Sequence, residues 1–158
     1  MGGRMTLSKQ MKAFFDTLAY SEGTDKPGQP TKDRGYDVLV GGGLFTGYKD
    51  HPRKLIKLPK LGISSTAAGR YQILARYYDA YKKQLKLPDF SPSSQNAIAL
   101  QLVRECKAVD DIESGRIEEA LHKCRSRWAS LPGAGYGQHE HKMEKLIEVF
   151  KKSGGKVL

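Results

Sequence analysis

The sequence contains little that would anchor it in a membrane or hold it around a metal. Of its 158 residues only two, Cys106 and Cys124, are cysteine. Two cysteines without matching histidine spacing do not form a zinc site, and a chain of this length can bury a core without a disulfide or a metal. The sequence also lacks an apolar run of the roughly 18–20 residues that a membrane span needs. The composition therefore excludes an integral membrane protein.

The N-terminal ten residues are polar and basic and have no apolar centre. A cleavable secretory signal needs a stretch of roughly 7–15 apolar residues. We therefore expect the chain to be made and held in a cytoplasm, where thiols stay reduced.

Acidic residues are too few to balance the basic ones. The chain has 27 Lys and Arg against 17 Asp and Glu, which gives a formal net charge of +10. This surplus predicts attraction to a polyanion, which could be nucleic acid, an anionic membrane surface or an acidic cell wall. Because the charge is dispersed without a basic block, a simply well-solvated surface is an equally good interpretation.

The length favours one domain spanning residues 1–158. An alternating, β-branched run at 36–40, followed by Gly41-Gly42-Gly43, predicts a small hairpin with 44–45. Apolar residues at helical spacing predict helices over residues 7–22, 69–85, 92–106, 116–128 and 143–153. Since the strands and helices are segregated along the chain, the fold class is α+β, mainly helical with a small N-terminal β lobe.

Other parts of the sequence divide between structural and functional interpretations. Residues 48–68 have no period and read as a long loop, which is usually functional or mobile. The spacing of Cys124 from Leu121 and Trp128 predicts a buried thiol, and catalysis by a cysteine with His122, His139 or His141 is disfavoured. The tyrosines at 71, 77, 78 and 81 fit core and rim packing. Tyr136 lies in a glycine-rich loop and is a better candidate for ligand contact.

Glu22 is the most informative candidate for chemistry. It continues the apolar stripe of Met11, Phe15 and Leu18, at the C-terminal end of the first predicted helix. Desolvation and the helix dipole both raise the pKa of a carboxyl in this position, so that it can act as a general acid. The alternative is a frayed terminal glutamate that reaches solvent or a lysine.

Asp37 lies in the predicted hairpin and has two interpretations. If the hairpin packs across the end of the first helix, Asp37 could face Glu22 as the second carboxylate of a glycosidase pair. Equally, it could hold the backbone of a turn.

A set of short strings, taken in order, carries a resemblance to a known family. The strings are Ser21-Glu22-Gly23-Thr24, Gly35-Tyr36-Asp37-Val38, Val40-Gly41-Gly42, Leu44-Phe45, His51-Pro52-Arg53-Lys54-Leu55, Gly69-Arg70-Tyr71-Gln72, Asp89-Phe90-Ser91-Pro92 and the run from Trp128 to Gln138. In this order and spacing the chain resembles the lambda-type phage endolysins, a family of lysozyme-like lytic transglycosylases, over residues 12–155.

The resemblance implies a lysozyme-like α+β fold and a reaction. Such enzymes cleave the β-1,4 bond between N-acetylmuramic acid and N-acetylglucosamine in peptidoglycan, forming 1,6-anhydro-N-acetylmuramic acid during host cell lysis. Glu22 matches the catalytic glutamate, which protonates the leaving oxygen while the 6-hydroxyl of the muramic acid attacks. One carboxyl suffices, and neither a metal nor another cofactor is implied.

The resemblance also implies a substrate site and partners. Residues 48–61 and 130–142 correspond to an upper and a lower lip over the cleft. The expected substrate-binding residues are Tyr36, Asp37, Tyr71, Gln72, Ser130, Tyr136 and Gln138. The expected partner is the peptidoglycan glycan strand, bound by a monomer without nucleic acid or stable membrane insertion. The enzyme would wait in the host cytoplasm until a holin releases it to the periplasm and cell wall.

Two alternatives stay open at this point. One is a hydrolytic N-acetylmuramidase in which Asp37 holds the attacking water. The other is a non-catalytic basic domain that binds cell wall or nucleic acid through its charge.

Overall fold

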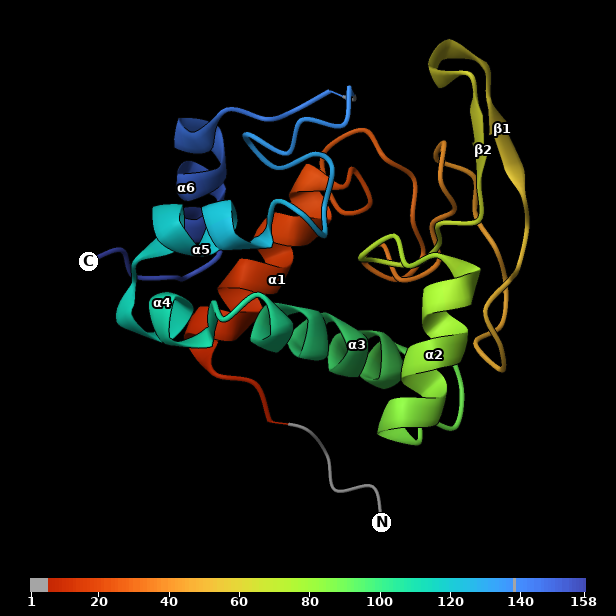
Figure 1. Cartoon of the computed structure of the whole chain (residues 1–158), viewed down its shortest axis with the longest axis horizontal. Helices are drawn as coiled ribbons and strands as arrows, with labels where there is room; N and C mark the ends of the chain where they lie inside the picture. Colours follow the sequence, from red (N-terminus) through yellow and green to blue (C-terminus); the bar gives the residue numbers. More distant parts are fainter. Residues whose placement is uncertain (1–5, 138) are drawn as a thin grey trace. The chain divides into compact units, whose positions relative to one another are not determined.

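The computed structural model describes residues 6–137 and 139–158. In chain order the elements are α1 (Lys9–Ser21), β1 (Ile56–Leu58), the 3-10 helix η1 (Pro59–Leu61), β2 (Ile63–Ser65), α2 (Ala75–Leu85), α3 (Pro92–Glu105), α4 (Val109–Ser114), α5 (Ile117–Cys124) and α6 (Met143–Lys152) (Figure 1). They fall into two compact units. The terminal unit is the chain up to Glu22 together with Ala99–Leu158, and the central unit is Gly23–Ile98.

Within the described residues, the longest apolar stretches of helix are too short to cross a membrane.

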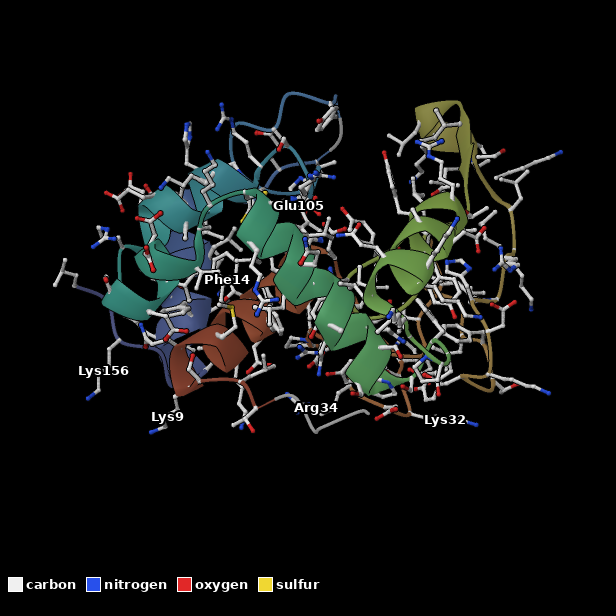
Figure 2. All side chains as sticks on the ribbon, turned by 60° about the horizontal axis from the view of Figure 1, so that its bottom comes forward. Lys9, Phe14, Lys32, Arg34, Glu105 and Lys156 are labelled. Carbon is white, nitrogen blue, oxygen red and sulfur yellow. The ribbon has the colours of Figure 1, made fainter. Side chains whose placement is uncertain are left out.

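The terminal unit is built around α1. This helix packs against α4 and α6, and α5 contacts both of these helices. Phe14, Phe15 and Leu18 on α1 are buried, and Phe14 points into the group of surrounding helices (Figure 2). Ser8 begins the helix by accepting a hydrogen bond from the backbone N–H of Met11 at 3.0 Å. The predicted helix over 7–22 is therefore confirmed.

The remaining helices of this unit agree with the prediction except at α4 and at the end of α5. The sequence pattern did not predict α4. The helix predicted over 116–128 ends at Cys124, because the next residues make tighter three-residue turns, with Arg127 N–H bonded to the Cys124 carbonyl at 3.0 Å. Trp128 nevertheless completes the buried stripe, and the burial of Cys124 is confirmed.

The central unit departs most from the prediction in its strands. The expected return of 36–40 onto 44–45 occurs, but as one antiparallel bridge between Val38 and Leu44 and not as two regular strands. The Leu39 N–H bonds to the Gly43 carbonyl at 2.6 Å, and the Phe45 N–H to the Asp37 carbonyl at 2.9 Å. Leu39 also forms an antiparallel bridge with Ala68, so the segment shares its backbone hydrogen bonds among several loops. The antiparallel sheet is β1 with β2, inside the stretch that the sequence analysis assigned to loop, in the register Ile56↔Ser65, Lys57↔Ser64 and Leu58↔Ile63.

The helix predicted over 69–85 begins only at Ala75. The preceding residues form a tight turn, in which Ala68 and Ile73 exchange backbone hydrogen bonds of 2.9 and 3.1 Å. Gly69 makes this turn possible, because its φ of 83° lies in the left-handed region that glycine tolerates. Tyr71 is thus buried from a turn rather than from a helix.

Candidate active site

Glu22 lies at the C-cap of α1, where the apolar face of the helix ends. Gly23 follows with a φ of 79°, in the left-handed region in which helices commonly end. The Glu22 side chain is half-buried, and burial raises its pKa from 4.5 to about 7. A hydrogen bond from Ser130 lowers the pKa but does not outweigh desolvation. The predicted direction of the shift is therefore confirmed, and the carboxyl titrates near neutral pH.

Two serine hydroxyls extend from Glu22 as a chain. The Ser130 hydroxyl donates to Oε2 of the ionised Glu22. The Ser21 Oγ lies 2.7 Å from the Ser130 Oγ. Since the proton of Ser130 is used on the carboxylate, Ser21 donates to Ser130 in this state. This arrangement stabilises the carboxylate by a hydroxyl that is itself polarised by a second hydroxyl.

His141 holds the backbone on both sides of this chain. Its backbone N–H donates to the Ser130 carbonyl at 2.9 Å, and its Nε2 lies 3.1 Å from the Ser21 carbonyl. Because a carbonyl only accepts, Nε2 carries the proton here. The ring also packs on Tyr20, with centroids 5.4 Å apart. His141 therefore links the end of α1 to the loop that carries Ser130.

The loop after Ser130 is held together by Glu140. Its two carboxylate oxygens accept hydrogen bonds from the backbone N–H groups of Gly133 and Gly135, each at 2.9 Å. These bonds lower the pKa of Glu140. The Tyr136 hydroxyl donates to the Ser126 carbonyl at 3.0 Å, while 57% of the residue stays exposed. Ligand contact by the exposed Tyr136 stays a prediction, and Gln138 lies outside the described residues.

Tyr36 and Tyr71 share one partner in the central unit. Their hydroxyls donate to the side-chain oxygen of Asn96, at 2.9 and 2.6 Å. The two rings meet edge to face, with centroids 6.3 Å apart. Tyr71 is buried, and burial raises its pKa, whereas Tyr36 is only half-buried. Of the two, Tyr36 can present a surface to a ligand, and Tyr71 fixes its position.

Asp37 and Gln72 both hold local backbone. The Asp37 carboxylate accepts from the Thr31 hydroxyl at 2.5 Å and from the Lys32 backbone N–H at 3.0 Å. The Gln72 side-chain amide donates to the Gly69 carbonyl at 2.9 Å. The backbone-holding interpretation of Asp37 therefore describes its observed contacts. A direct role in substrate binding stays a prediction for both residues.

A buried arginine organises the same region. Arg70 is only 2% exposed and donates to the Asp25 carboxylate at 3.1 Å and to the Arg34 carbonyl at 2.9 Å. It also donates to the Tyr71 hydroxyl at 3.2 Å, and its guanidinium lies 5.5 Å from the centre of the Tyr36 ring. The two tyrosines are thus fixed by a charge inside the unit.

Sequence reasoning found Glu22 and Ser130 but missed their neighbours. Ser21 was not singled out, although it directly precedes Glu22. His141 was considered only as a cysteine partner, and Asn96 carried no local signal. In the described residues, groups of three or more His, Cys, Asp or Glu suited to a metal ion do not occur.

Similarity to known proteins extends over almost the whole chain. A family model described as Endolysin matches residues 12–157. The chain is 59% identical over 152 residues to the endolysin of Escherichia phage lambda, covering 96% of this chain and 95% of that protein. It is 52% identical over 157 residues to the endolysin of Escherichia phage P2, covering 93% and 94%.

Solved structures agree with these relatives. Bacteriophage lambda lysozyme complexed with a chitohexasaccharide matches with a TM-score of 0.94 and 56% identity, covering 98% of this chain and 99% of that chain. A second structure of bacteriophage lambda lysozyme matches with a TM-score of 0.90 over the same shares.

Proposed function

The chain belongs to the endolysin family of peptidoglycan-cleaving phage enzymes, and we propose that it is a lytic transglycosylase with Glu22 as its catalytic acid. The family resemblance and the lysozyme-like α+β fold expected from the sequence are confirmed. The proposal concerns the type of cleavage and the residues that perform it.

The desolvated position of Glu22 beside the Ser130 hydroxyl is the observation that supports the proposal. With a pKa of about 7, a large share of Glu22 carries its proton near neutral pH and can donate it to a glycosidic oxygen. Once the proton has left, the Ser130 hydroxyl donates to the new carboxylate. The same side chain can therefore act first as an acid and then as a base.

This double role suits an intramolecular reaction. Glu22 protonates the oxygen that leaves with N-acetylglucosamine, and the bond from that oxygen to C1 of N-acetylmuramic acid breaks. The 6-hydroxyl of the same muramic acid forms a new bond to C1, and its proton passes to the Glu22 carboxylate. The product is a 1,6-anhydro sugar, Glu22 is protonated again, and no water is consumed.

The substrate in this proposal is the glycan strand of peptidoglycan. Lambda lysozyme, the structural relative, was solved with a chitohexasaccharide, which is an oligomer of N-acetylglucosamine. By analogy, we assign sugar contacts to the exposed faces of Tyr36 and Tyr136, and support of the binding surface to Tyr71, Gln72 and Asp37. Ser130 donates a hydrogen bond to Glu22. For Gln138, contact with the sugar stays a prediction.

The proposal includes where the enzyme acts. A monomer made in the host cytoplasm reaches its substrate after a holin opens the inner membrane, since peptidoglycan lies beyond that membrane. The net charge of +10 aids adsorption to the anionic envelope, while the bond that is cleaved is neutral.

Product analysis in oxygen-18-labelled water tests the reaction type. Purified sacculi are digested to completion and the muropeptides are examined by mass spectrometry, with a hydrolytic muramidase as the positive control for label uptake. We expect 1,6-anhydro ends without the heavy oxygen. Reducing muramic acid ends that carry the label would overturn the proposal in favour of the hydrolytic alternative.

Asp37→Asn separates the same two alternatives through one residue. Both oxygens of Asp37 already accept hydrogen bonds from Thr31 and Lys32, which favours a shaping role. We expect the variant to be destabilised by about 1–2 kcal/mol and to make the same anhydro product. A folded variant that binds glycan but no longer cleaves it would instead identify Asp37 as a participant in the chemistry.

A further inference from the structure

The ends of α3 and α5 are tied together on both sides of the two cysteines. On one side, Lys123 Nζ donates to the Lys107 carbonyl at 3.4 Å. On the other, Arg127 Nη2 binds Glu105 Oε1 at 2.9 Å, and Glu105 marks the end of α3 in Figure 2. Lys107 and Glu105 flank position 106, whereas Lys123 and Arg127 bracket position 124. The cysteines are thus held opposite each other within the terminal unit.

The two thiols differ in exposure and in charge. Cys106 is half-buried and Cys124 is fully buried. A hydrogen bond from the Cys124 thiol, assisted by the positive charge of Arg127, lowers the pKa of Cys106. The same hydrogen bond, together with burial, raises the pKa of Cys124. Cys106 is therefore the more accessible and more nucleophilic thiol, and Cys124 is its protonated neighbour.

We infer that Cys106 and Cys124 form a dithiol redox site, which closes to an intramolecular disulfide by exchange with a small disulfide oxidant such as oxidised glutathione. This site is separate from Glu22 and goes beyond peptidoglycan cleavage. A redox site suits an enzyme whose substrate is peptidoglycan. Peptidoglycan lies outside the inner membrane, where disulfides persist, whereas the cytoplasm keeps thiols reduced.

The exchange balances in two steps. The Cys106 thiolate attacks one sulfur of the oxidant, forming a mixed disulfide and releasing one glutathione thiolate. Cys124 then loses its proton and attacks the Cys106 sulfur, which releases the second glutathione thiolate. Two electrons pass from the protein thiols to the oxidant, and the two protons are taken up by the departing thiolates.

The expected consequence is a more stable terminal unit. The disulfide would close the chain between residues 106 and 124, a segment that includes α4 and α5. Cross-links over loops of this size restrict the unfolded chain more than the folded one. We expect the melting temperature to rise by roughly 5–10 °C on oxidation.

Intact mass spectrometry and thermal melting test the site in the full-length protein. Reduced protein is incubated with oxidised glutathione and then treated with maleimide. We expect the folded wild type to lose two hydrogen atoms in mass, to take up no maleimide and to melt at the higher temperature. Cys124→Ala should stop at the glutathione adduct on Cys106, and Cys106→Ser should remain unmodified and melt at one temperature under both conditions.

Other outcomes would overturn the inference. They are a folded wild type in which both thiols still react with maleimide after oxidation, a stable glutathione adduct on wild-type Cys106, and a disulfide that links two chains. If Cys124→Ala does not fold, the wild type and Cys106→Ser still decide the question. Since none of these measurements uses cleavage of peptidoglycan, failure of the redox site is distinct from failure of the proposed reaction.

Discussion

Two ionisable groups, the half-buried Glu22 in one unit and the buried Arg70 in the other, have opposite surroundings. In the terminal unit, Glu22 is desolvated and receives a hydrogen bond from the neutral hydroxyl of Ser130. In the central unit, Arg70 is almost fully buried but binds the Asp25 carboxylate, a backbone carbonyl and the Tyr71 hydroxyl. Ionising Glu22 therefore costs free energy, whereas the charge of Arg70 is stabilised by three hydrogen-bond acceptors.

This difference assigns Glu22 to the reaction and Arg70 to the support of the fold. A carboxyl that is costly to ionise keeps its proton and can deliver it, at the expense of folding stability. A guanidinium whose hydrogen bonds are met fixes the loops around it and has no proton to give. The contrast predicts that changes at Glu22 alter activity without harming the fold, and that changes at Arg70 do the reverse.

The sharpest test of the prediction for Glu22 is the substitution Glu22→Gln. The amide keeps the size of the side chain but cannot donate a proton to a leaving oxygen, so we expect cleavage of sacculi to fall by about 10²–10⁴-fold. Turbidity loss of a sacculus suspension measures the rate, and circular dichroism checks the fold. A folded variant with undiminished cleavage would remove Glu22 from the mechanism. Lysis that is unchanged in the variant and depends only on the positive charge of the protein would support the non-catalytic basic domain.

The prediction that Arg70 supports the fold is tested by Arg70→Lys, with Leu18→Met as the comparison. A lysine keeps the charge but cannot reach three acceptors in the planar arrangement of Arg70, so we expect a loss of about 2–4 kcal/mol in the free energy of unfolding. Leu18→Met in the apolar core of the terminal unit should cost less than about 1.5 kcal/mol. Urea unfolding measures both, and equal losses would contradict the contrast.

The cost of ionising Glu22 should be visible as a pH dependence of stability. Between pH 4.5 and 7 the unfolded carboxyl is ionised while the folded one still holds its proton, so the folded state binds more protons and stability falls as pH rises. Above pH 7 the full penalty, about 1–3 kcal/mol, is present. Glu22→Gln should lack it, so the variant gains on the wild type from pH 5 to pH 8. Parallel stability curves would refute this.

The smallest effect is expected at Ser130→Ala. Ser130 lowers the pKa of Glu22, so its removal should raise that pKa further. Because the protonated acid is the active form, the pH above which kcat/KM declines should move upward by about one pH unit. The profile is recorded with soluble glycan fragments, and Ser130→Thr, which keeps the hydroxyl, serves as the control. A profile that does not move would place Ser130 outside the proton chemistry.

The sequence predicted the terminal unit better than the central one because their cores are made differently. Apolar residues at helical spacing identify α1 and α6, since each helix buries one face. The turn between Ala68 and Ile73 depends instead on left-handed backbone at Gly69 and Gln72, and on side-chain bonds such as that of Gln72 to the Gly69 carbonyl. Such contacts leave no period in the sequence, so the helix expected from residue 69 was placed too early.

The same distinction holds for the active site. Glu22 could be identified because it continues the stripe of its own helix, and the raised pKa followed from that position. Its surroundings could not be derived locally, because Ser130, which bonds to Glu22, and His141, which bonds to the neighbouring Ser21 carbonyl, come from far along the chain. Arg70 carried no sign of burial, since a lone basic residue normally reads as exposed.

The division of the chain has a consequence for the timing of synthesis. The central unit is continuous in sequence, whereas the terminal unit joins the first residues to the last sixty or so. Glu22 leaves the ribosome 108 residues before its partner Ser130, a delay of roughly 5–20 s at bacterial elongation rates. A nascent chain therefore carries its acid without the hydroxyl that supports the carboxylate. The hydrogen-bonded pair is completed only in the final stage of translation, after the central unit has had time to fold.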